Sequence, residues 1–184
     1  MHSRMSWEDL WPLLVGGTLD TLYMVGFATL FTVLIGLPLG VLLFLSRCQG
    51  IVPMPRLNAV LGAIINTGRS LPFIVLLIAL IPFTRLLVGT TLGSTAAIVP
   101  ITIVAFPLFA RLTESALDEV DYGRIEAVLS MGGNAWHVVC KALLPEALPA
   151  LLAGTTLTIV MLIGFSLMAG VTGGGGLGAF AIRY

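Results

Sequence analysis

Residues 21–46 read TLYMVGFATLFTVLIGLPLGVLLFLS and contain no charged side chain between Asp20 and Arg47. A helix that spans a bilayer needs about 20 mostly apolar residues, so this stretch predicts a membrane-spanning helix. Gly36 and Gly40 lie four residues apart, and small residues at that spacing let a second helix approach closely. Glycine is also frequent in membrane helices in general, so both interpretations of the pair remain open.

The composition extends this conclusion to the whole chain. Of 184 residues, 58% are hydrophobic and only 10% are charged, whereas soluble domains carry roughly 25% charged residues. The net charge is zero, and nothing in the sequence indicates the basic stripe expected of a nucleic-acid-binding protein. Cys48 and Cys140 stand alone and form no disulfide or metal-site pattern. The N-terminus lacks a basic region and a small-residue cleavage site, so we expect no cleavable signal peptide.

The second predicted span needs a length argument. Only 15 uncharged residues separate Arg69 from Arg85, and they would cover about 22 Å as a helix, less than the roughly 30 Å hydrocarbon core. We therefore expect a span over Leu57–Thr84, with Arg69 inside the helix and a kink at Pro72. A charge at such a position normally faces protein or a water-filled cavity.

Two further spans follow. Leu86–Ala110 is uncharged and should form a tight helical hairpin with the second span. The fourth span is expected from about Leu148 to about Val171. The glycine-rich residues 173–178 are poor helix formers, and we predict an irregular loop that lies at the surface or lines a cavity.

One sizeable polar segment, Arg111–Glu146, separates the third and fourth spans and carries six of the nine acids. Its 36 residues are enough for two short helices joined by a turn at residues 132–134. With four spans, the side that holds this segment has five basic residues and the other side three, which favours a cytoplasmic segment and an outside N-terminus. The two sets are Arg47, Arg56, Arg111, Arg124 and Lys141 against Arg4, Arg85 and Arg183.

The polar segment also contains a spaced motif. Glu126-Ala127-Val128 is followed after three residues by Gly132, then after nine residues by Ala142-Leu143-Leu144-Pro145. This resembles the EAA loop of ABC-importer permeases, which reads E-A-A, three residues, G, nine residues, I-x-L-P. Val128 and Ala142 depart from the pattern by one apolar residue for another. The alternative is an ordinary solvated helical loop that matches by chance.

The similarity extends from about residue 12 to the last residue. The segments carrying it are Arg69–Ile74, Ile81–Arg85, Val88–Thr90, Leu143–Pro149 and Gly174–Gly178. They look like the permeases of bacterial methionine importers. This resemblance implies an all-α membrane domain of five spans with its N-terminus outside, of which four lie in this chain. It also implies two identical permeases, two copies of a cytoplasmic ATPase and an external substrate-binding lipoprotein.

The resemblance further implies one permease domain over residues 1–184, with a cytoplasmic coupling loop at 111–146. The family's fifth helix is expected to begin where the chain stops at Tyr184, so the domain is expected to be C-terminally incomplete. The coupling loop would dock on the ATPase, which binds the ATP, and the permease would bind no cofactor itself. The expected coupling residues are Glu126, Ala127, Gly132, Gly133, Leu144 and Pro145.

Residues of the translocation pathway are harder to select. Phe165 and Met168 lie three apart and share a helix face, and the Met thioether is soft and adaptable. They are candidates to line the pathway, with helix packing or lipid contact as the alternative. Arg69 is either a pathway charge or a residue paired within the bundle. His137 is expected on the docking surface, because no second ligand is spaced for a metal.

The resulting hypothesis is a permease subunit of an ATP-driven importer for a small amino acid, with methionine favoured by resemblance. Such a subunit has no catalytic residue and converts the closure of its ATPase partners into alternating access. An intramembrane enzyme would need a Ser/His pair or paired Asp residues within the bilayer, and the predicted spans hold no His and no acid. A membrane scaffold that only recruits a soluble partner is the other alternative.

Overall fold

The computed structural model describes residues 7–48 and 50–183, and in these ranges every regular element is helical. The basic residue Arg4 and the chain's last residue, Tyr184, lie outside the described residues. The described residues divide into two compact units. The first unit comprises the described parts of 1–31, 72–104 and 159–184, and the second comprises 32–71 and 105–158.

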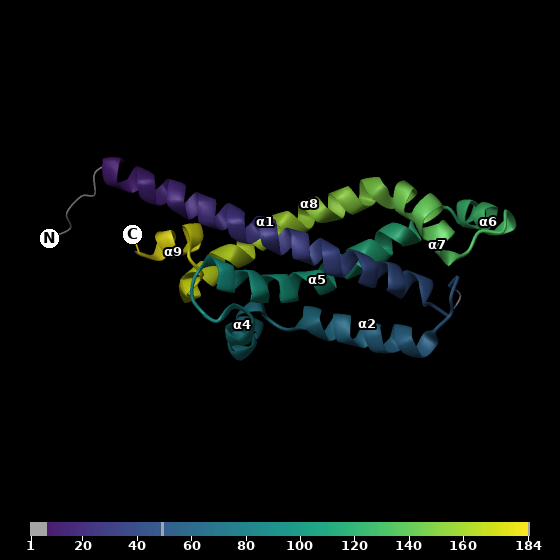
Figure 1. The fold of residues 1–184 in the computed structure, drawn as a ribbon, viewed down its shortest axis with the longest axis horizontal. Coiled ribbons are helices and arrows are strands. Elements are labelled where there is room, and N and C mark those ends of the chain that lie inside the picture. The colour runs from purple at the N-terminus through teal and green to yellow at the C-terminus, as the bar shows by residue number, and fades with distance from the viewer. Residues whose placement is uncertain (1–6, 49, 184) are drawn as a thin grey trace. The chain divides into compact units, whose positions relative to one another are not determined.

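Helix α1 is Trp7–Leu45, and its apolar stretch Leu10–Leu45 is long enough to cross a membrane (Figure 1). The predicted span Thr21–Ser46 therefore begins too late, and Asp20 lies within the helix. A single charge does not break a helix, because it removes no backbone donor and imposes no special backbone angle. The prediction that the spans hold no acid is wrong at this position.

The second predicted span is not one helix. The chain forms α2 (Pro55–Ser70), α3 (Phe73–Ala79) and α4 (Ile81–Val88). The break lies at Leu71 and Pro72, which both have extended ψ angles, 135° and 137°, as expected for a proline and the residue before it. Arg69 consequently lies in the last turn of α2. The prediction that it lies inside one continuous helix is wrong. Together α2 and α3 are long and apolar enough for one interrupted span.

The third span begins later than predicted. Residues 86–88 belong to α4, which ends at Gly89 with a φ of 80°, a left-handed conformation that glycine adopts at little cost. Helix α5 is Ser94–Asp118. It continues through Ala110 and Arg111, so the first part of the predicted polar segment is an extension of this span.

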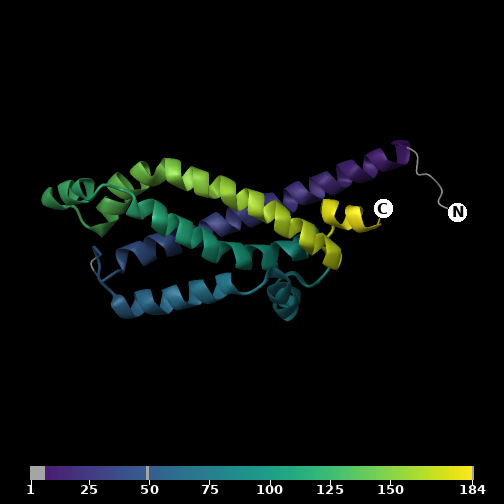
Figure 2. The same cartoon turned by 180° about the vertical axis from the view of Figure 1, so that it is seen from behind.

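The rest of the polar segment matches its prediction of two short helices. They are α6 (Tyr122–Ser130) and α7 (Ala135–Val138), followed by the π-helical turn η1 (Val139–Leu143). They lie at the end of α5 and the start of α8, as Figures 1 and 2 show in green. Ten buried residues from α5, α6, α7, η1, α8 and the segment between α5 and α6, among them Leu117, Val138 and Leu143, form an apolar core beneath them.

The last span, α8, is Leu144–Ala169 and begins four residues before the predicted Leu148. The π-helical turn η2 (Gly170–Gly174) follows, with a left-handed Gly173 inside it. The glycine-rich stretch is only partly irregular, because α9 (Gly176–Arg183) begins within it. The Thr21 hydroxyl of α1 accepts a hydrogen bond from the N–H of Leu177 at 3.0 Å, which satisfies one free donor at the start of α9.

Helices α1 and α5 approach closely within the second unit. A Cβ atom on Gly36 would lie 2.9 Å from the Phe109 ring, and one on Gly40 would lie 2.5 Å from the Ala110 carbonyl oxygen. No larger residue fits at Gly40 without moving the backbone of α5. The close-approach interpretation of the Gly36–Gly40 pair is therefore confirmed.

Candidate functional site

The predicted coupling motif starts on α6. Asp121 caps this helix, because its side chain accepts the Gly123 N–H at 2.7 Å. One turn later, Glu126 and Ala127 are exposed, whereas Ile125 is buried in the apolar core. No basic group among the described side chains pairs with Glu126. Its carboxylate is therefore free to meet a positive group of another chain.

The turn between α6 and α7 uses its two glycines differently. Gly132 has a φ of 79° and nothing within 4 Å of an added Cβ, so its role is conformational. At Gly133 an added Cβ would lie 2.7 Å from the Val128 carbonyl oxygen, which accepts the Gly133 N–H. The first glycine permits the left-handed turn and the second permits close packing.

Residue 134 then starts α7. The Asn134 side chain accepts the backbone N–H of His137 at 3.0 Å, and the His137 ring accepts the backbone N–H of Asn134 at 3.4 Å. This reciprocal capping box fixes the first turn. His137 thus has a local structural contact, while the neighbouring Trp136 is 71% exposed. Among the described residues, no group of three possible metal ligands occurs.

The end of the motif joins η1 to α8. The N–H of Leu144 bonds to the carbonyl of Val139, five residues back, and Pro145 in the next position has no N–H to donate. Proline is tolerated here because it lies in the first turn of α8. An exposed ion pair from Arg124 to Glu146, at 2.5 Å, links α6 to the same turn. The motif residues therefore begin on α6 and end in the first turn of α8, with α7 and η1 between them.

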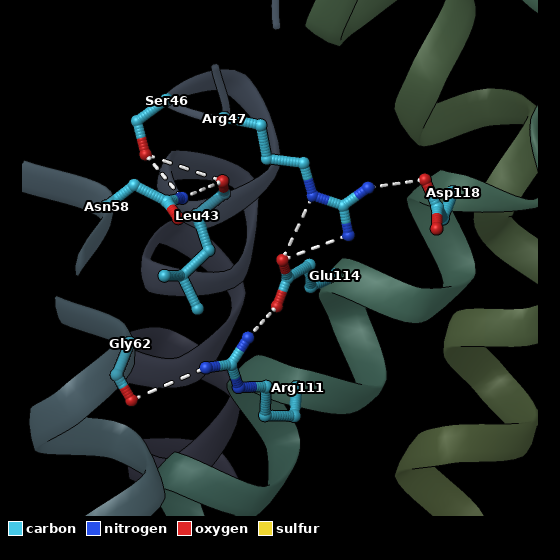
Figure 3. A network of polar contacts seen from close by, with 8 residues as sticks. All are labelled: Leu43, Ser46, Arg47, Asn58, Gly62, Arg111, Glu114 and Asp118. Atoms are coloured by element: carbon cyan, nitrogen blue, oxygen red, sulfur yellow. Dashed lines mark hydrogen bonds and ion pairs between the residues drawn. The ribbon is translucent and has the colours of Figure 1, made fainter. Parts of the chain in front are cut away.

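A second group of side chains in the same unit was not selected from the sequence. Arg47, just after α1, places Nε and Nη2 at 3.1 and 3.0 Å from Glu114 Oε1, and Nη1 at 2.5 Å from Asp118 (Figure 3). Arg111 donates to the other Glu114 oxygen at 2.5 Å. The spacing of Arg111 and Glu114, three residues apart on α5, was the only signal in the sequence. Arg47 is 67 residues away from Glu114.

The neighbouring carboxylates explain why Arg47 stays ionised despite its partial burial. Burial alone would lower the pKa of Arg47, but its hydrogen bonds with Glu114 and Asp118 and their charges raise that pKa above its ordinary value. The Arg47 guanidinium also lies 5.4 Å from the centre of the Phe44 ring, within the range of a cation–π contact. The arginine is therefore a permanent cation at the end of α1.

The three pathway candidates are placed differently from one another. In the first unit, Phe165 is half-buried and stacks on Phe73 of α3, with ring centres 4.7 Å apart. Met168 is 46% exposed. In the second unit, Arg69 is exposed at the end of α2 and forms no ion pair with the described side chains. Phe165 thus has a packing contact, whereas Met168 and Arg69 are available for other contacts.

Comparisons with known proteins agree with this arrangement. The chain is 57% identical over 175 residues to the probable D-methionine transport system permease protein MetI of Pasteurella multocida, covering 95% of this chain and 81% of the relative. It is 47% identical to the D-methionine transport system permease protein MetI of Escherichia coli K12, covering 90% of this chain and 76% of the relative.

Solved structures give the same result for the fold. An inward-facing structure of the MetNI methionine ABC transporter has a chain with a TM-score of 0.95 and 47% identity, covering 98% of this chain and 83% of that one. An amino acid ABC transporter solved with histidines has a TM-score of 0.76 at 22% identity, covering 96% of this chain and 79% of that chain, and shares the fold. The all-α membrane permease fold predicted from the sequence is confirmed.

The match to a family model covers most of the chain. Residues 36–183 match the model described as "binding-protein-dependent transport system inner membrane component". These residues include the α1–α5 contact, the polar cluster that Arg47, Arg111, Glu114 and Asp118 form, the predicted coupling motif and the glycine-rich turn described above. The chain therefore belongs to this family of multi-pass inner-membrane transport permeases.

Proposed function

We propose that the chain is the permease subunit of an ATP-driven methionine importer. The single observation that carries the substrate is the close similarity to D-methionine permeases, 57% identity in one case. The subunit provides the pathway, performs no chemistry of its own and binds no cofactor. ATP is bound and hydrolysed by a separate cytoplasmic ATPase, as the name of the similar ABC transporter suggests.

The proposed assembly contains two copies of this chain, the ATPase and an external substrate-binding lipoprotein. The chain acts as one permease domain over residues 1–184, embedded in the bilayer lipid with its N-terminus outside. Alternating access would follow from ATP-driven closure of the ATPases. This arrangement is supported by the apolar helices and by the excess of basic residues on the side of the predicted topology that holds the coupling segment.

The coupling segment, residues 111–146, is the proposed contact with the ATPase. Glu126 and Ala127 present an exposed face of α6, and the Gly132-Gly133 turn fixes the direction of α7. Leu144 and Pro145 join the assembly to the pathway helix α8. A rigid loop whose exposed acid lacks a partner in the described chain suits docking on a basic site of a soluble protein.

The proposed pathway residues are Phe165, Met168 and Arg69. Met168 and Phe165 lie on the last part of α8, where the sequence is apolar and Met168 is exposed, and a thioether substrate would suit such surroundings. Arg69 carries an unpaired charge at the end of α2, and such a charge in a membrane protein normally faces a water-filled cavity.

The test is uptake of labelled methionine in a methionine auxotroph that expresses the full gene with its ATPase and binding protein. We expect uptake to need all three proteins and to fall at least about tenfold with Glu126→Ala, because one lost charge-assisted contact corresponds to roughly 1.5–3 kcal/mol. Glu119→Ala, an exposed acid outside the motif, is the matched control. Uptake without the ATPase, or equal uptake by Glu126→Ala and Glu119→Ala, would contradict the proposal.

A complex that assembles with the ATPase but takes up no methionine would discard this substrate alone. The same membranes can then be tested with other labelled small amino acids. A chain that recruits the ATPase yet transports none of them would be a scaffold and not a permease.

A further inference from the structure

The polar cluster of the second unit joins three helices in a closed ring of contacts (Figure 3). Arg47 connects the end of α1 to Glu114 on α5. Arg111 of α5 reaches α2, where it donates to the Gly62 carbonyl at 3.4 Å. Asn58 of α2 closes the ring, because it donates to the Leu43 carbonyl of α1 at 2.7 Å. Each of the three helices is therefore held to both others by a side chain.

Glu114 is the centre of this ring. Its side chain is only 9% exposed, while those of Arg47 and Arg111 are 35% and 26% exposed. One carboxylate oxygen accepts from Arg47 and the other from Arg111. A single carboxylate thus holds two cations that would otherwise repel each other, and losing it would leave both without their shared anion.

The ring also lies close in the chain to α6, the first short helix of the coupling segment. Asp118, the outer acceptor of Arg47, is the last residue of α5, and α6 begins at Tyr122 after only three residues. A displacement of α6 therefore reaches the end of α5 directly. Among the described side chains, the polar contacts of the ring are the ones that link the ends of α1 and α2 to this end of α5.

We propose that Glu114 is a positioning residue for ATP coupling, which makes the cytoplasmic ends of α1, α2 and α5 move together when α6 and α7 of the coupling segment move. This inference rests on the proposed docking of that segment on an ATPase. The forked geometry matters as well as the charge, because Arg47 uses three nitrogens on two carboxylates. A lysine would keep the charge but not the fork.

The experiment uses the complete permease–ATPase complex in proteoliposomes with the binding protein, and it measures methionine taken up per ATP hydrolysed. We expect Glu114→Gln and Arg47→Lys to assemble with the ATPase and hydrolyse ATP, while this ratio falls roughly three- to tenfold. The matched control is Arg56→Met on α2, because Arg56 is exposed and has no ion-pair partner among the described side chains. Its ratio should equal that of the unmodified complex.

A further variant separates positioning from simple stabilisation. A buried Arg–Glu–Arg group can be replaced by apolar residues of similar volume without loss of stability, so Arg47→Met, Arg111→Met and Glu114→Leu are combined. Thermal unfolding should return to that of the unmodified complex while uptake per ATP stays low. If uptake per ATP recovers together with stability, or if Glu114→Gln and Arg47→Lys keep the normal ratio, the inference is overturned.

Failure of the inference is distinguishable from failure of the docking proposal. If the coupling segment does not dock, Glu126→Ala leaves assembly and uptake unchanged. If the segment docks but the ring has no role in coupling, Glu126→Ala still impairs uptake. The Glu114 and Arg47 variants then take up as much methionine per ATP hydrolysed as the unmodified complex.

Discussion

The two compact units solve the problem of polar groups in a membrane protein by different means. All four ion pairs between described side chains lie in the second unit, around the ends of α1 and α5 and within the coupling segment. Of the six described glycines with positive φ, five lie in the first unit, at Gly89, Gly93, Gly173, Gly175 and Gly176. One unit is held by charged side chains and the other by tightly turned backbone.

This difference follows from what each unit must satisfy. Backbone groups that leave a helix within a membrane need internal partners, and the first unit supplies them at its turns through bonds such as Gly93 N–H to the Gly173 carbonyl at 2.9 Å. The second unit carries the polar segment 111–146, where charged groups can reach water. Its side chains can therefore be ionised while still holding helices together.

The largest loss of stability is expected at Gly40 in the second unit, where α1 and α5 leave no space for a side chain. A leucine at Gly40 must displace the α5 backbone, because even a Cβ would lie 2.5 Å from the Ala110 carbonyl oxygen and from Thr113 Cβ. We expect Gly40→Leu to lower the free energy of unfolding in detergent by about 3 kcal/mol or more. The matched control is Gly26→Leu on the same helix, where nothing lies within 4 Å. Equal stability of the two variants would contradict the tight α1–α5 contact.

A smaller effect is expected at the turns of the first unit. Gly173 has a φ of 96°, and a Cβ there would lie 2.7 Å from Leu92 Cδ2, a movable side-chain atom. We expect Gly173→Ala to lower the free energy of unfolding by about 1–2 kcal/mol, mainly through the left-handed backbone. Gly164→Ala within α8 is the control and should be neutral or stabilising by up to about 1 kcal/mol. A neutral Gly173→Ala would show that this turn can adopt another conformation.

The comparison also shows which features a sequence can reveal. The turn between α6 and α7 was predicted correctly at Gly132–Asn134, because glycine and asparagine have specific local roles in a left-handed turn and a helix cap. The span boundaries were less accurate, because charges were used as markers. Asp20 lies inside α1, and Arg111 lies inside α5. Helices end where the backbone changes direction, as at Gly89, and not where the first charge appears.

The second span failed for a related reason. The length of the uncharged stretch predicts one helix that continues through Arg69 with a kink at Pro72, whereas the helix ends at Ser70 and a new one begins at Phe73. Within the candidate site, the local motif around Glu126 was found because its parts are close in sequence. The ring around Glu114 was missed because Arg47 and Asn58 reach it only through the packing of three helices. Such contacts depend on tertiary structure, which no local pattern reports.

The smallest effect is expected at the exposed ion pair of the second unit, which tests whether burial or charge strengthens its polar contacts. Arg124 and Glu146 lie 2.5 Å apart, but their side chains are 60% and 39% exposed. Water and salt screen such a pair, so a double-mutant cycle with Arg124→Ala and Glu146→Ala should give a coupling of about 0–1 kcal/mol. The cycle is measured by unfolding of the purified permease at low and at high salt. A coupling energy well above this range that persists in high salt would mean that two charges stabilise the fold by proximity alone, without burial. The contrast between this pair and the buried Glu114 ring would then lose its physical basis.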